Sequence, residues 1–93
     1  MNYTKIRKIR KNLDFLDSKL LNLIKKRTLL VNQILKQKKY KNQIIDKKRI
    51  NVILKNIRSK SVKKKIDPRV SNKIWRSMIN AFIAYEYRSF KKK

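Results

Sequence analysis

The chain has 93 residues, of which 29 are lysine or arginine and 5 are acidic, giving a formal net charge of +24. It contains no cysteine and no histidine, which excludes disulfides, thiolate or histidine metal sites and a Ser-His catalytic pair. Glycine is absent and the single proline is Pro68, so the composition favours helices joined by short loops over a strand-and-turn fold.

The charge excess, taken at face value, predicts a polyanionic partner such as nucleic acid. However, lysine, asparagine and isoleucine are all abundant, and all three have A/T-rich codons. We therefore favour compositional bias over nucleic-acid binding, which the charge alone leaves open. The sequence shows no signal peptide and no apolar run of membrane-spanning length, so we expect a cytoplasmic protein without membrane contact.

Residues 4–39 are predicted to form one long helix, because apolar residues recur at heptad spacing without a glycine or proline. The two rows of heptad positions hold Ile6, Leu13, Leu20, Arg27 and Ile34, and Ile9, Leu16, Leu23, Leu30 and Gln37. Such a helix is about 50 Å long, and the remaining chain is too short to cover it. The pattern therefore predicts a homodimer formed through this helix.

A second, short helix is predicted over residues 47–59, after a loop. Asp46 is its expected N-cap, and its apolar residues follow the spacing of one helix face. The polar residues 59–66 are predicted to form a linker.

A third helix of medium length is predicted over residues 68–90. Asp67 and Pro68 provide an N-cap and a first helical residue at its start. No internal repeat or composition boundary divides the chain. We therefore expect one all-α domain of three helices over residues 1–93.

Arg27 is a cation in an otherwise apolar row, and such a group is costly to bury unless an anion meets it. Lys38 follows eleven residues later, which is about 20° of rotation on a helix, so both side chains can reach a ligand between them. Arg10 is too distant to join Lys38 in the same chain. It can fall beside Arg27 of a second, antiparallel copy.

Glu86 lies on the apolar face of the third helix, together with Phe82. It is either a structural partner of a lysine or a carboxyl kept protonated to donate a hydrogen bond. For Asp46 and Arg49, helix capping with a surface arginine is the favoured explanation, and a place at the border of the core suits Arg49 equally well. These residues describe a small cationic pocket without a nucleophile, which suits a compact dicarboxylate and needs no metal or cofactor.

The order and spacing of these residues resemble the all-helical chorismate mutase family over about residues 6–90. The residues that carry the resemblance are Arg10, the run Leu16-Asp17-x-x-Leu20-Leu21, Arg27, Lys38 and the motif Asp46-x-x-Arg49.

The resemblance implies an intertwined dimer that rearranges chorismate to prephenate by an intramolecular [3,3] shift. It further implies that Arg27 and the partner chain's Arg10 bind the two carboxylates of chorismate. Lys38 would donate to the ether oxygen whose bond breaks. Asp46 and Arg49 would line the pocket.

Two positions depart from the family's common pattern. Ile50 stands where mutases commonly have a glutamate that binds the substrate hydroxyl, and Glu86 stands where a glutamine usually assists the lysine. Glu86 must therefore be protonated to help the developing oxyanion. With Phe82, the missing glutamate also resembles isochorismate pyruvate lyases, which share the fold and form salicylate. The resemblance favours the mutase, with the lyase as the alternative.

Overall fold

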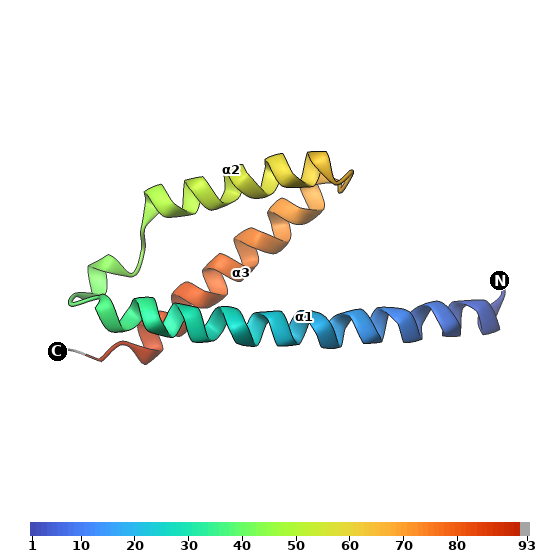
Figure 1. Cartoon of the computed structure of the whole chain (residues 1–93), viewed down its shortest axis with the longest axis horizontal. Helices are drawn as coiled ribbons and strands as arrows, with labels where there is room; N and C mark the ends of the chain where they lie inside the picture. The colour runs from blue at the N-terminus through green and yellow to red at the C-terminus, as the bar shows by residue number, and fades with distance from the viewer. Residues whose placement is uncertain (92–93) are drawn as a thin grey trace. The chain divides into compact units, whose positions relative to one another are not determined.

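The computed structural model describes residues 1–91; residues 92 and 93, the end of the predicted domain, lie outside this part. It contains three α-helices, which are α1 (Tyr3–Gln37), α2 (Lys47–Lys63) and α3 (Pro68–Ser89) (Figure 1). A 3₁₀-helix, η1 (Lys41–Gln43), lies between α1 and α2. No strand occurs in the described residues, so the predicted all-α fold of three helices is confirmed.

Residues 1–31 form one of two units, and they consist almost entirely of the first part of α1. None of them is buried. The leucines of both heptad rows are exposed, with exposed fractions of 52% for Leu13 and 58% for Leu23. The helix forms as predicted, but the chain on its own leaves this apolar surface uncovered.

Residues from Asn32 onward form the second unit, which holds the end of α1, η1, α2 and α3. Helices α2 and α3 run in opposite directions from a tight turn and pack against each other beside it (Figure 1). The hydroxyl groups of the buried residues Ser61 and Ser71 are 2.6 Å apart and share a hydrogen bond across this contact. The buried hydrophobic residues of the described chain are Leu35, Ile44 and Ile79, all in this unit.

The helix boundaries agree with the prediction except at the end of α2. That helix continues to Lys63, so the polar linker predicted for residues 59–66 is wrong over its first five residues. Polarity was misleading here because Ser61 satisfies its hydroxyl within the helix, donating to the Ile57 carbonyl at 2.6 Å. The connection to α3 is only residues 64–67.

Both predicted N-caps are confirmed. The Asp46 carboxylate accepts a hydrogen bond from the Arg49 backbone N–H at 3.0 Å, and that of Asp67 accepts one from the Arg69 N–H at 2.9 Å. Pro68 occupies the first turn of α3, where its missing N–H costs nothing. Hydrogen bonds from the Arg69 side chain and then from its backbone lower the pKa of Asp67 below its ordinary value.

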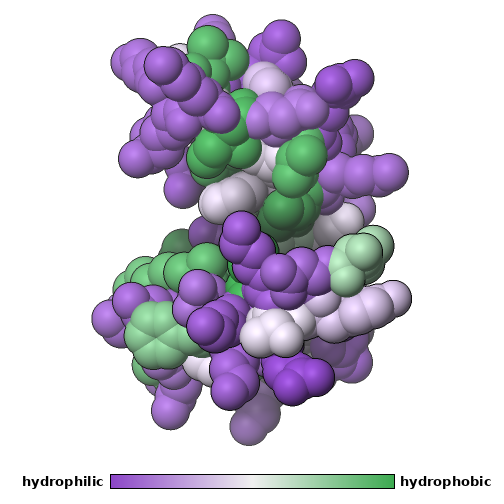
Figure 2. Space-filling model, turned by 90° about the vertical axis from the view of Figure 1, so that its right-hand side faces the viewer, coloured by the Kyte–Doolittle hydropathy of each residue, from purple (hydrophilic) through white to green (hydrophobic). Residues whose placement is uncertain are grey.

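Hydrophilic side chains cover much of the surface in Figure 2, with hydrophobic atoms exposed between them. The same mixture is found along α3, where Val70 and Ile74 are each 54% exposed beside basic neighbours. Apolar surface and positive charge therefore alternate on helix faces that the chain itself does not cover.

The turn between α2 and α3 contains a strained residue. Lys65 has φ = 60°, in the left-handed region that costs an L-residue about 1 kcal/mol. It is held there by a helix-ending motif in which Ile66 N–H donates to Ser61 C=O at 2.9 Å and Lys65 N–H donates to Val62 C=O at 3.1 Å. Glycine usually takes this position, but the chain has none.

Replacing Lys65 with glycine should therefore raise the free energy of unfolding by about 0.5–1 kcal/mol. Urea unfolding at a fixed protein concentration measures the change. The matched variant is Lys64→Gly, whose φ of −88° needs no glycine, and this change should not stabilise the protein. Equal effects of the two substitutions would contradict the assignment of strain to Lys65.

Candidate functional site

The site centres on an ion pair between Lys38 and Glu86. Lys38 Nζ lies 3.0 Å from Glu86 Oε1, and the two side chains are 17% and 10% exposed. Lys38 is the first residue after α1, and Glu86 is in the last turn of α3. The pair therefore joins two segments that are 48 residues apart in the sequence.

The Lys38 ammonium group has a second oxygen nearby. It donates to the backbone carbonyl of Ile44 at 3.5 Å, and Ile44 is only 3% exposed. Because the chain turns back through η1, this carbonyl comes to lie beside the lysine six residues earlier. An ammonium group has three donors, so Lys38 can bond both oxygens and still offer one hydrogen to a ligand.

A second polar contact holds α3 against the end of α1 close to the ion pair. The Tyr85 hydroxyl donates to Asn32 Oδ1 at 2.7 Å, and both residues are half-buried. The rings of Tyr85 and Phe82 pack edge to face with their centroids 6.4 Å apart. Since Tyr85 directly precedes Glu86, this contact fixes the part of α3 that presents the carboxyl group to Lys38.

The predicted site residues at the start of α2 have different surroundings. Asp46 and Arg49 are exposed and Ile50 is half-buried. The Asp46 carboxylate caps the N-terminus of α2, as the helix-capping prediction for this residue expects. Within residues 1–91, no hydrogen bond or ion pair joins Asp46 or Arg49 to Lys38 or Glu86. Their contribution to a site stays a prediction.

The two predicted carboxylate-binding arginines lie in the other unit. Arg27 is half-buried and Arg10 is exposed. Lys38 belongs to the second unit, and the place of Arg10 and Arg27 beside it stays a prediction. Of the predicted site residues, the structure brings Lys38 and Glu86 into contact, with Phe82 one helical turn before Glu86.

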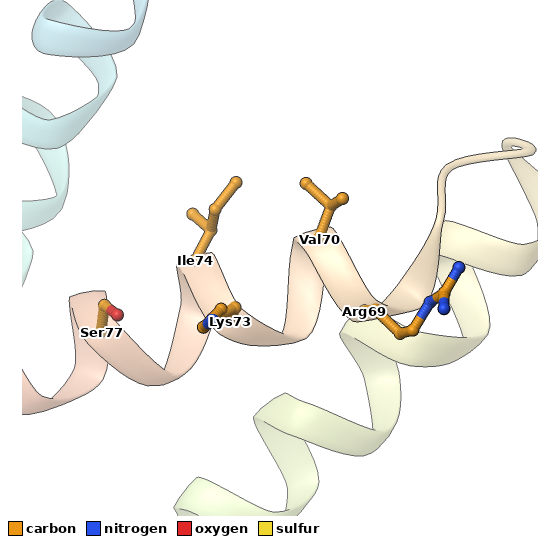
Figure 3. A pocket seen from close by; sticks show the side chains of 5 residues that line it. All are labelled: Arg69, Val70, Lys73, Ile74 and Ser77. Carbon is orange, nitrogen blue, oxygen red and sulfur yellow. The ribbon is translucent and has the colours of Figure 1, made fainter.

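A shallow apolar depression lies elsewhere, on the first half of α3. It is lined by Arg69, Val70, Lys73, Ile74 and Ser77, all from this one helix. Figure 3 shows Val70 and Ile74 projecting side by side from α3, while Arg69 points away from them. None of the predicted site residues lines it. Its lining resembles an uncovered helix face more than a ligand pocket.

No group of three or more histidine, cysteine, aspartate or glutamate residues in residues 1–91 is placed to hold a metal ion. None of the helices in the same part of the chain is both long and apolar enough to cross a membrane. The site has one ammonium group and one carboxyl group at its centre.

A half-buried ammonium beside a carboxyl, at the junction of the first and third helices of an all-helical chain, is consistent with the family that the sequence resembles. A family model described as chorismate mutase type II matches residues 9–87. The chain belongs to this family, which is a family of isomerases. No curated protein and no solved structure matches the chain.

Sequence reasoning missed three features of the site. These are the Ile44 carbonyl, the Asn32–Tyr85 hydrogen bond and the folding of η1 back toward Lys38. A backbone carbonyl has no sequence signal of its own. Asn32 and Tyr85 do have one, since each is a polar residue next to the apolar positions of its helix, but one sequence does not reveal that they meet.

The Tyr85→Phe substitution should lower the free energy of unfolding by about 1 kcal/mol, because it removes the hydroxyl that bonds Asn32 and keeps the packed ring. Urea unfolding at a fixed protein concentration measures it. The matched control is Tyr87→Phe, since the Tyr87 ring is 40% exposed and its hydroxyl makes no hydrogen bond in the described structure. Equal destabilisation by the two changes would contradict a role for the Asn32 contact.

Proposed function

We propose that this chain catalyses the rearrangement of chorismate to prephenate at a site built around Lys38 and Glu86. Membership of the chorismate mutase type II family supports the reaction. The observation that supports the site is the ion pair, which places the proposed ether-oxygen donor 3.0 Å from the residue proposed to assist it. A half-buried ammonium group and a buried carboxyl group, brought together from positions 48 residues apart, suit a site better than a solvated surface does.

The reaction needs no nucleophile, metal or cofactor. One bond breaks and one forms within a single molecule, so the protein contributes by holding the flexible dianion in its reactive conformation. Cations aimed at the charge that develops on the ether oxygen stabilise the transition state. In the proposed site Lys38 is this donor, while Arg27 and the partner chain's Arg10 hold the two substrate carboxylates.

The remaining predicted residues are proposed to shape the pocket. Asp46, Arg49 and Ile50 stand at the start of α2, and Phe82 stands one turn before Glu86 on α3. The Ile50 side chain offers no hydrogen bond to the substrate hydroxyl, and we propose that Arg49 lies nearest to it among the polar side chains of this segment.

We further propose that the functional molecule is a homodimer, with a second copy of the chain covering α1. The leucines of the heptad rows are more than half exposed in the chain alone. The chain exposes 8605 Å². A compact monomer of this mass should expose about 5,800 Å². The difference exceeds the area of about 800 Å² that each partner buries in an interface of standard size.

The dimer gives Arg10 a role that the single chain does not. In an antiparallel pairing of two α1 helices, the heptad rows of the two copies face each other. Arg10 of one copy then falls beside Arg27 of the other. An intertwined dimer would in this way complete each site with one arginine from the partner.

The purified protein should convert chorismate to prephenate, and Lys38→Ala should lower kcat by about 100-fold or more, because it removes a donor to the developing charge. Separate incubations with chorismate and isochorismate, with the products identified by chromatography, test this. Lys39→Ala is the control, since Lys39 is the exposed neighbour of Lys38.

The products separate the possible results. Prephenate from chorismate supports the proposal. Salicylate with pyruvate from isochorismate would replace it with the lyase reaction, and conversion of neither substrate would contradict both. Equal activities of the Lys38→Ala and Lys39→Ala variants would remove Lys38 from the site.

Without substrate, Glu86 is the ion-pair partner of Lys38, as the structural alternative for this carboxyl predicts. It must take up a proton before it can donate a hydrogen bond to the ether oxygen, so the mutase activity should fall as the pH rises. Lys38 is a charged group that faces it, at 3.0 Å. A pH series of kcat for the wild type and for Glu86→Gln checks this. The glutamine keeps its donor at every pH, so its profile should be flatter, and identical profiles would contradict the proposed role.

A further inference from the structure

We propose that Gln43 is a positioning residue that holds the Lys38 ammonium group in place for the reaction. The inference rests on the proposed function of Lys38. Gln43 is exposed and belongs to η1. Gln43 therefore contributes to the structure through its hydrogen bonds and not through packing.

The side-chain oxygen of Gln43 closes the turn that follows Lys38. Gln43 Oε1 accepts hydrogen bonds from the Lys39 backbone N–H at 2.7 Å and from the Tyr40 backbone N–H at 3.0 Å. These are the two residues directly after Lys38, where α1 has ended and its hydrogen-bond ladder no longer fixes the chain. One oxygen atom thus sets the direction in which the backbone leaves Lys38.

The other end of the same turn returns to Lys38. Gln43 N–H donates to Tyr40 C=O and Ile44 N–H donates to Lys41 C=O, each at 3.1 Å, and these bonds form η1. Ile44 is the buried residue directly after η1, and its carbonyl accepts a hydrogen bond from Lys38 Nζ at 3.5 Å. Gln43 therefore ties the start of the turn to its end, directly before the carbonyl that contacts the lysine.

The ammonium group is consequently held from two sides. Glu86 Oε1 on α3 binds it from one side, and the Ile44 carbonyl binds it from the turn that Gln43 closes. Without the Gln43 oxygen, the exposed N–H groups of Lys39 and Tyr40 can bond to water instead. The fold survives this loss, but the backbone on either side of Lys38 is no longer fixed. A displacement of about 1 Å is enough to cost a large factor in rate.

The kinetic test compares Gln43→Ala with Gln43→Glu and Asn42→Ala. Alanine removes the accepting oxygen and should lower kcat by about 10-fold with a smaller change in KM, because Lys38 acts mainly in the transition state. Glutamate keeps an acceptor at the same reach and should keep kcat within about twofold of the wild type. Asn42 is the neighbouring amide of the same turn, and its alanine variant should behave as the wild type does.

The Lys38→Ala background shows whether Gln43 acts through Lys38. If it does, adding Gln43→Ala to Lys38→Ala should change kcat by less than about twofold, since the group to be positioned is gone. Independent, multiplying effects would overturn the proposal. Equal losses in Gln43→Ala and Gln43→Glu would overturn it as well.

A measurement without substrate separates this inference from the proposed reaction. Glu86 is the only glutamate in the chain, so labelling glutamate with ¹³C gives one side-chain carboxyl resonance that reports on the Lys38–Glu86 contact. Lys38→Ala should shift this resonance, Gln43→Ala should shift it in the same direction, and the control Asn42→Ala should leave it unchanged. An unchanged resonance in Gln43→Ala would overturn the positioning role even in an active enzyme. If the wild type does not convert chorismate, the proposed reaction is contradicted, but the expected shifts would still show that Gln43 positions Lys38.

Discussion

The Lys38–Glu86 ion pair is the interaction on which the second unit of this chain depends. It joins the residue that follows α1 to the last part of α3, while α2 and the two connecting turns lie between them in the sequence. Burying two charges is costly unless each has a well-placed partner. The Asn32–Tyr85 hydrogen bond and the Ile44 carbonyl surround the pair with further polar contacts, so its position is fixed from α1, from α3 and from the turn.

Most of the fold could be predicted because helix signals are local. The heptad rows define α1, and Asp46, Asp67 and Pro68 mark the starts of α2 and α3. The error at the end of α2 shows the limit of such signals. The serines and lysines there are as polar as those of a linker. However, Ser61 packs against α3 and forms a hydrogen bond with Ser71, and amino-acid composition does not reveal such a contact between helices.

The site could be predicted in part. Lys38 and Glu86 were found because one follows Arg27 at helical spacing and the other is an acid on an apolar face, and the structure brings them together. Gln43 and the Ile44 carbonyl were missed because their role depends on how the turn folds back. Arg10 and Arg27 are a different case, since they belong to the other unit and their place in the site stays a prediction. The proposed dimer is what would bring the partner chain's Arg10 to it.

The most direct test of the account uses two variants that should each be nearly inactive, Arg10→Ala and Lys38→Ala. In a mixed dimer, one site has Lys38 from the first variant and Arg10 from the second. Co-refolding equal amounts should therefore recover about one quarter of the wild-type chorismate mutase activity, since half of the dimers are mixed and each has one intact site. If the mixture is no more active than its separate components, Arg10 does not complete the partner's site and the shared-site account is wrong.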